Sequence, residues 1–141
     1  MELRARALRL LARREHSRQE LARKLFPRAE SPEALEFLLT DLEKRKQLSD
    51  ERFASERTHV LSRKYGAARI RQDLKAKGVD RETIASISSE GELERARGIL
   101  DRKYQERATT REERAKRMRF LQGRGFSAEI IFKLLSTRGE D

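Results

Sequence analysis

Apolar residues recur at spacings of three and four along most of the chain. After Ser17, Leu21 and Leu25 fall on one face of a helix, and Ile70 and Leu74 do the same after Gly66. β-branched and aromatic residues never gather in the alternating pattern of a half-buried strand. The pattern predicts an all-α protein.

The expected helix starts share one sequence pattern. An apolar residue stands just before the N-cap, and a second stands at the fourth helical position, where the two side chains can pack together. The pairs are Leu48 with Phe53, Tyr65 with Ile70, Val79 with Ile84, and Phe126 with Ile131.

Polar caps mark further starts. Ser17 with Glu20 and Thr110 with Glu113 have the spacing of a capping box, and Ser31 precedes a proline at the first helical position. Together these signals predict helices that begin near residues 2, 18, 32, 50, 67, 81, 90, 111 and 128.

Grouped in threes, the expected helices form an internal repeat. We expect three-helix modules at residues 1–48, 49–88 and 89–141. A unit of about 45 residues is too small to bury a full core alone, so neighbouring modules must stack, which predicts an elongated, curved helical array. The matching positions are Ser17, Leu21 and Leu25 with Gly66, Ile70 and Leu74, then Leu74, Gly78, Val79, Ile84 and Ile87 with Leu121, Gly125, Phe126, Ile131 and Leu134.

Composition narrows the class of partner. Of the 141 residues 41% are charged and 36% hydrophobic, and the net charge is +10, concentrated in residues 1–30, 51–80 and 101–124. Such a balance favours polyanionic partners, nucleic acid first. The charged N-terminus does not fit a signal peptide, and no apolar run approaches the roughly 20 residues of a membrane span, so we expect a cytoplasmic protein with no membrane partner.

Residues for catalysis or for metal and cofactor binding are poorly represented. The chain has no cysteine, and His16 and His59 lie far apart, so both are interpreted as packing or surface residues. The carboxylates alternate with Lys and Arg at helical spacing, which is typical of a surface. The Gly123–Gly125 stretch ends a helix and lacks the context of a nucleotide loop. We therefore expect that the protein is not an enzyme and has no metal site and no cofactor.

The segment from Arg63 to Lys77 holds six Lys and Arg and one acid, Asp73. It is either a solvated helix face or a surface for a polyanion, and the overall charge favours the second reading. Tyr65 is expected to pack on Ile70 and not to serve as a platform for a base. The candidate contact residues are Arg63, Lys64, Arg69, Arg71, Lys75 and Lys77 here, and Arg114, Lys116 and Arg117 in the third module, where Met118 and Leu121 are expected in the core.

Four stretches carry a resemblance to a known family. They are "LRLLARREHSRQELARKL" (residues 8–25), "LSDERFASE" (48–56), "SRKYGAARIRQDLKAKGVD" (62–80) and "RFLQGRGFSAEII" (119–131). In combination they resemble the RecX family of bacterial recombination regulators, collinearly over essentially the whole chain. The charged "SSEGELERARG" (88–98) departs from that pattern, where a more apolar helix is expected.

The resemblance implies three tandem three-helix modules and no active site. It implies a protein that binds RecA nucleoprotein filaments on single-stranded DNA and inhibits filament extension, ATP hydrolysis and strand exchange. We expect this protein to be a monomer. In the second-module string it implies that Ile70, Leu74 and Gly78 serve the fold and that the basic residues meet the filament or DNA. The alternative is a helical protein that acts directly on DNA or RNA.

Overall fold

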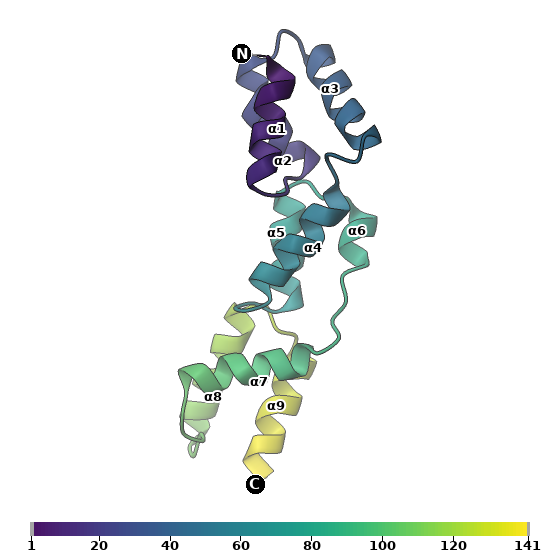
Figure 1. Ribbon diagram of the computed structural model, residues 1–141. Helices are drawn as coiled ribbons and strands as arrows, with labels where there is room; N and C mark the ends of the chain where they lie inside the picture. Colours follow the sequence, from purple (N-terminus) through teal and green to yellow (C-terminus); the bar gives the residue numbers. More distant parts are fainter. Residues whose placement is uncertain (1, 141) are drawn as a thin grey trace. The chain divides into compact units, whose positions relative to one another are not determined.

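The computed structural model describes the backbone of residues 2–140 and the side chains of residues 2–136 (Figure 1). This part of the chain contains helices and no strand, so the all-α prediction is confirmed. Every α-helix begins within two residues of its predicted start. The elements are α1 (Leu3–Arg13), α2 (Arg18–Leu25), the 3₁₀ turn η1 (Phe26–Arg28), α3 (Pro32–Lys44), α4 (Asp50–Leu61), α5 (Ala67–Ala76), α6 (Arg81–Ala85), α7 (Glu92–Lys103), α8 (Arg111–Gly123) and α9 (Ala128–Glu140).

Local capping explains why several of these helices start where they do. The hydroxyl of Ser17 accepts a hydrogen bond from the backbone N–H of Glu20, at 3.0 Å. Thr110 and Glu113 form the complete capping box. In α2 the Glu20 carboxylate pairs with Arg14 at 2.7 Å, in place of the contact with the N-cap N–H that would complete the box. The capping signals in the sequence therefore set α2 and α8 as expected.

The chain divides into two compact units that cut across the expected modules. One consists of Met1–Arg57 and Leu74–Ser86, and the other of Thr58–Asp73 and Ile87–Asp141. The helices α4 and α5 each contribute to both units. The second module is therefore shared between them, and the module boundaries of the sequence analysis remain a prediction.

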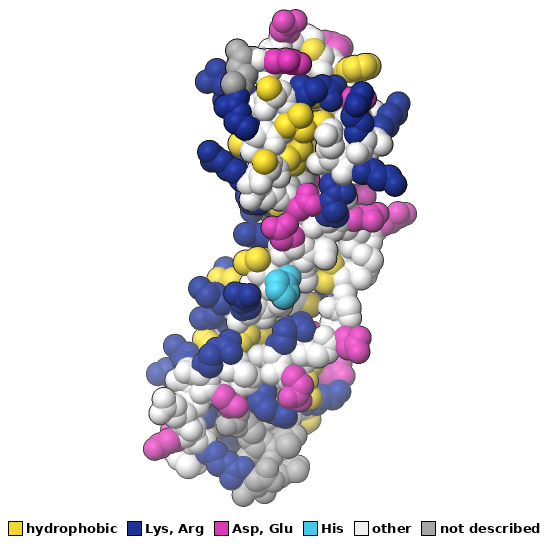
Figure 2. Space-filling view, viewed as in Figure 1, with side chains coloured by type: hydrophobic (Ala, Val, Ile, Leu, Met, Phe, Trp, Pro, Cys, Tyr) yellow, Lys and Arg dark blue, Asp and Glu magenta, His cyan; other side chains and the backbone are white. Residues whose placement is uncertain are grey.

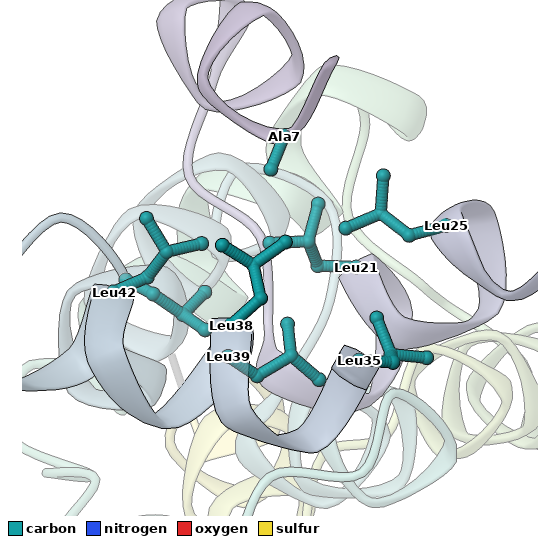
Figure 3. Close-up of a cluster of buried hydrophobic side chains, with 8 residues drawn as sticks. Ala7, Leu21, Leu25, Leu35, Leu38, Leu39 and Leu42 are labelled. Carbon is teal, nitrogen blue, oxygen red and sulfur yellow. The ribbon is translucent and has the colours of Figure 1, made fainter. Parts of the chain in front are cut away.

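The first unit has a leucine-rich core at the meeting of α1, α2 and α3 (Figure 3). Ala7 comes from α1, and the leucines of α2 and α3 point toward one another below it. Their spacing of three and four residues brings each apolar stripe inward, as the sequence pattern requires. The buried residues are Ala7, Leu21, Leu25, Leu35, Leu38, Leu39, Leu42 and Leu48.

The second unit has its own core, built from α7, α8 and α9. Leu121 is fully buried as predicted, but Met118 is 44% exposed, so its assignment to the core was wrong. The inward position near Met118 is taken by Arg117, which is 6% exposed and packs on Tyr104. The buried apolar residues are Ala96, Ile99, Leu100, Leu121, Phe126, Ile131, Leu134 and Leu135.

In the first unit, the N-terminus of α2 meets the C-terminus of α5. The N–H of Arg18 donates to Asp50 Oδ1 at 2.7 Å, and the Ser17 hydroxyl donates to the carbonyl of Lys77 at 2.6 Å. Gly78 follows with a φ of +82°, and a Cβ there would lie 2.5 Å from the Cβ of Gln19. Glycine is required by both the backbone angle and the close approach.

In the second unit, the N-terminus of α5 meets the C-terminus of α8 in the same way. The N–H of Ala67 donates to Glu92 Oε1 at 2.8 Å, and the N–H of Gly66 donates to the carbonyl of Arg124 at 2.7 Å. Gly125, with a φ of +91°, lies against Arg69.

The two junctions use equivalent positions of the repeat. In each junction, the acceptor carboxylate belongs to the first residue of a module's first helix. The donor is the first N–H of the second helix in the preceding module. Glu92 is only 6% exposed in this role. The charged start of the third module thus has a structural cause, since an apolar residue at Glu92 would leave the N–H of Ala67 unsatisfied.

His16 lies beside the first junction and is 1% exposed. Its Nδ1 is 3.1 Å from the carbonyl of Arg14, and its Nε2 is 3.0 Å from Nζ of Lys24. A carbonyl only accepts and an ammonium only donates, so a neutral ring with its proton on Nδ1 satisfies both contacts. Burial is the largest cause of a lowered pKa at His16, and the charges of Arg14 and Lys24 also lower it, whereas the hydrogen bond with the carbonyl of Arg14 and the charge of Glu20 act in the opposite direction.

This arrangement predicts a loss of stability in mild acid. The unfolded chain takes up a proton at His16 near pH 6.5, whereas the folded chain does so at lower pH. The contribution of His16 is therefore complete above about pH 6.5 and falls as the pH drops below that value. Urea unfolding between pH 5 and 8 should show this slope, and His16→Gln, which cannot titrate, should flatten it. An unchanged slope would contradict the neutral, buried ring.

Candidate nucleic-acid interface

The candidate residues of the second module differ in exposure. Arg63 and Lys64, after the end of α4, and Lys75, on α5, are exposed. Arg71 and Lys77 are half-buried. Arg63 through Arg71 belong to the second compact unit, and Lys75 and Lys77 belong to the first. The expected single stripe is thus divided between the units. Arg63, Lys64 and Lys75, which are exposed, are its strongest candidates for contact with an outside partner, and Arg69 is exposed as well.

Arg69 has a contact within the protein in addition to its exposed surface. Its guanidinium donates to the carbonyl of Gly123 at 3.0 Å and lies 4.5 Å from the centre of the Tyr65 ring. Arg124 lies 5.7 Å from the same ring. Two cations therefore lie near the Tyr65 ring.

The candidate contact residues of the third module also differ in exposure. Arg114 and Lys116 are exposed on α8. Arg117 is 6% exposed, with its guanidinium 4.5 Å from the centre of the Tyr104 ring. The prediction that Arg117 contacts a partner is therefore corrected: its charge is used inside the second unit, in a cation–π contact.

A pocket of about 340 Å³ opens in the second unit between the end of α4 and the helices α7 and α8. Sequence reasoning found two of its cations, Arg63 and Lys64. It missed the others, because they come from helices about 40 and 60 residues away and no local motif joins them. The pocket is lined by Arg63, Lys64, Ile99, Arg102, Lys103, Phe120 and Arg124.

Backbone carbonyls and an aromatic ring hold three of these cations in place. Arg102 Nη2 donates to the carbonyl of Arg63 at 3.0 Å, and Arg124 Nη1 donates to the carbonyl of Lys64 at 3.2 Å. The Phe120 ring centre is 5.1 Å from Nζ of Lys103 and 5.0 Å from the guanidinium carbon of Arg124. We name this arrangement the five-cation pocket.

Positive charge in this pocket is not neutralised by neighbouring acids. Among the side chains that the structure describes, no carboxylate lines the pocket. Arginines of the first unit behave differently, since Arg4 pairs with Asp41 and Arg18 with Glu36 and Glu43. Figure 2 shows Lys and Arg side chains gathered over the region where α4 ends and α7 and α8 lie.

In the part of the chain that the structure describes, no three His, Cys, Asp or Glu side chains are grouped as metal ligands would be. Within those residues, too, none of the helices has the length and apolar character to cross a membrane.

Family models match the chain three times in succession. The first three-helix domain of RecX matches residues 4–40, the second matches residues 49–86, and the third matches residues 90–135. The chain belongs to the RecX family. Its three tandem three-helix domains are those expected from the repeat, and all five cations of the pocket lie in the second and third of these RecX domains.

Curated relatives agree over nearly the whole length. The chain is 44% identical to the regulatory protein RecX of Herbaspirillum seropedicae, covering 97% of this chain and 91% of the relative. It is 38% identical to the regulatory protein RecX of Ralstonia pickettii, covering 99% of this chain and 90% of that one. The RecX fold is also supported by the crystal structure of RecX from Lactobacillus salivarius, with a TM-score of 0.85 at 18% identity, over 99% of this chain and 96% of that chain.

Proposed function

We propose that this protein binds RecA nucleoprotein filaments on single-stranded DNA and inhibits filament extension, ATP hydrolysis and strand exchange. The observation that carries the proposal is membership of a family of regulatory proteins over the full run of three domains. The net charge of +10 and the exposed cations on α5 and α8 support a partner that contains nucleic acid. In this proposal the protein is a modulator, and the recombinase carries the catalysis.

Exposed aromatic side chains favour a partner that also contains protein. Phe37 on α3 is 74% exposed, and Phe132 on α9 is 68% exposed. A strand of nucleic acid bound through phosphates has no need of either ring, whereas protein interfaces are enriched in aromatic residues. The second candidate function, direct binding of DNA or RNA without a filament, is supported by the five-cation pocket.

Stoichiometry separates the two functions. The experiment is ATP hydrolysis by RecA on single-stranded DNA while this protein is titrated in. A filament modulator lowers hydrolysis when present at far fewer copies than RecA, because one bound copy affects many subunits. If hydrolysis falls only when the protein is sufficient to cover the strand, direct competition for DNA explains the effect and the filament proposal fails.

Exposed candidates outside the pocket provide a test of the contact surface. We expect Lys75→Gln combined with Lys116→Gln to weaken binding to RecA filaments several-fold. The free energy of unfolding should change by less than about 1 kcal/mol, because exposed charges contribute little to folding. Filament co-sedimentation and urea unfolding measure the two effects. Arg23→Gln combined with Lys44→Gln, also exposed, is the control for net charge. Equal binding by both double variants would show that these candidates are not the contact surface.

A further inference from the structure

The five-cation pocket has a feature that folding does not require. Arg63, Lys64, Arg102, Lys103 and Arg124 converge on one cavity, and no carboxylate is among the described side chains that line it. Like charges held close together repel one another, and the repulsion is greater beside the apolar Ile99 and Phe120 than in open water. A bound anion would relieve this repulsion, and the cavity is open to receive one.

Hydrogen bonds within the pocket also orient two of the five cations in advance. Arg102 and Arg124 are fixed by the carbonyls of Arg63 and Lys64, at 3.0 and 3.2 Å. Each guanidinium uses one nitrogen in that bond, which leaves further N–H groups for an acceptor. Donors that are already ordered lose little conformational entropy when a ligand binds. The site is therefore suited to an oxyanion with several acceptor oxygens.

We propose that the five-cation pocket is a binding site for the sugar–phosphate backbone of a nucleic-acid strand, and that it holds one phosphodiester without reading a base. A pocket of about 340 Å³ has room for a phosphate with an adjoining sugar, and its lining comes from three segments of chain. A flexible single strand can bend a phosphate into such a cavity, whereas the phosphates of a duplex lie on a stiff rod.

The position of the aromatic ring accounts for the absence of base recognition. Proteins that bind single strands often stack bases on aromatic side chains. Here the Phe120 ring has Lys103 and Arg124 near it, at 5.1 and 5.0 Å, and meets Tyr104 edge-on at 5.9 Å. The ring thus positions cations and is not available to a base. Affinity should come from phosphate contacts alone and should not depend on sequence.

The test uses the full-length protein without RecA, so its result is independent of the proposed function. Arg102→Gln combined with Lys103→Gln removes two exposed pocket cations. We expect binding of a fluorescent 20-nucleotide oligothymidylate to weaken about tenfold, with a shallower dependence on salt because fewer counterions are released. Arg97→Gln combined with Lys133→Gln is the matched control. It removes two charges from the same unit, but there each cation pairs with an acid, Glu94 or Glu129.

Three further probes define the ligand. A strand of the same length without bases should bind as tightly as oligothymidylate, within about twofold, and a duplex should bind more weakly. Loss of binding to the abasic strand would overturn the absence of base recognition. Equal losses in the pocket and control variants would overturn the site. If the pocket variant loses affinity for inorganic triphosphate but not for the strand, the site serves free phosphates and the proposal fails. Circular dichroism and thermal unfolding verify that both variants fold.

The ATP hydrolysis assay with the same pocket variant keeps this proposal separate from the filament proposal. A variant that no longer binds the strand but still inhibits RecA at low stoichiometry supports the pocket and shows that filament binding uses another surface. A variant that binds the strand normally overturns the pocket, whatever its effect on RecA.

Discussion

Leu74→Ala should lower the free energy of unfolding by roughly 2–5 kcal/mol, since removal of a large buried side chain loses apolar burial and leaves a cavity. Leu74 is 0% exposed, within the first compact unit. It lies three residues before Lys77, whose carbonyl accepts from Ser17 at the first junction. We therefore expect loss of core packing to weaken that junction as well. Unfolding in urea, followed by circular dichroism, measures the change.

The neighbouring residue provides the control for Leu74→Ala. Lys75 is exposed on the same helix, and Lys75→Ala should change the stability by no more than about 0.5 kcal/mol. Both substitutions place alanine in α5, so both should gain a similar small amount of helix stability. A loss of less than about 1 kcal/mol for Leu74→Ala would mean that α5 is not anchored through this side chain.

Helix positions could be predicted well because their signals are local. Ser17, Ser31 and Thr110 each accept from a backbone N–H three residues ahead, and this spacing is visible in the sequence. The start of α7 was placed two residues early. Its N-cap, Gly91, has a φ of +76° and no side-chain cap, so the sequence offered no polar signal at the right position.

The junctions could not be predicted because their partners are distant in the sequence. Asp50 and Glu92 appeared as ordinary surface carboxylates among Lys and Arg. In the folded chain they accept from Arg18 and Ala67, residues 32 and 25 positions earlier. Burial raises the pKa of Asp50 and nearby Glu43 and Asp80 add to the effect, whereas the hydrogen bond from the N–H of Arg18 opposes it. Only tertiary contact distinguishes these two acids from their neighbours.

The candidate interface was predicted only in part, because some of its residues come together only in the folded chain. Local charge density identified Arg63 and Lys64, which do line the five-cation pocket. It also selected Arg117, whose charge is buried against Tyr104, because helical spacing alone does not show which cation turns inward. Arg102 and Lys103 have a weaker local signal and join the pocket only through the packing of α7 beside the end of α4.

The second large effect is expected at Gly66, where the chain enters α5. A Cβ at this position would lie 2.6 Å from the carbonyl oxygen of Gly125 and 2.7 Å from the Phe126 ring. Backbone cannot move aside as a flexible side chain can, so Gly66→Ala should separate α5 from the end of α8. Overpacking costs about 1–3 kcal/mol. Weakened bonds from Gly66 to Arg124 and from Ala68 to Gly125 should add about 1 kcal/mol each.

A matched glycine substitution should have the opposite sign. Gly98 lies within α7, and a Cβ there would meet nothing closer than Arg102 Nη1 at 3.7 Å. Gly98→Ala should therefore raise the stability by up to about 1 kcal/mol through helix propensity. Urea unfolding of the two variants side by side decides the question. If Gly66→Ala is as stable as the unsubstituted protein, the close contact of α5 with the turn after α8 is not what holds the second and third modules together.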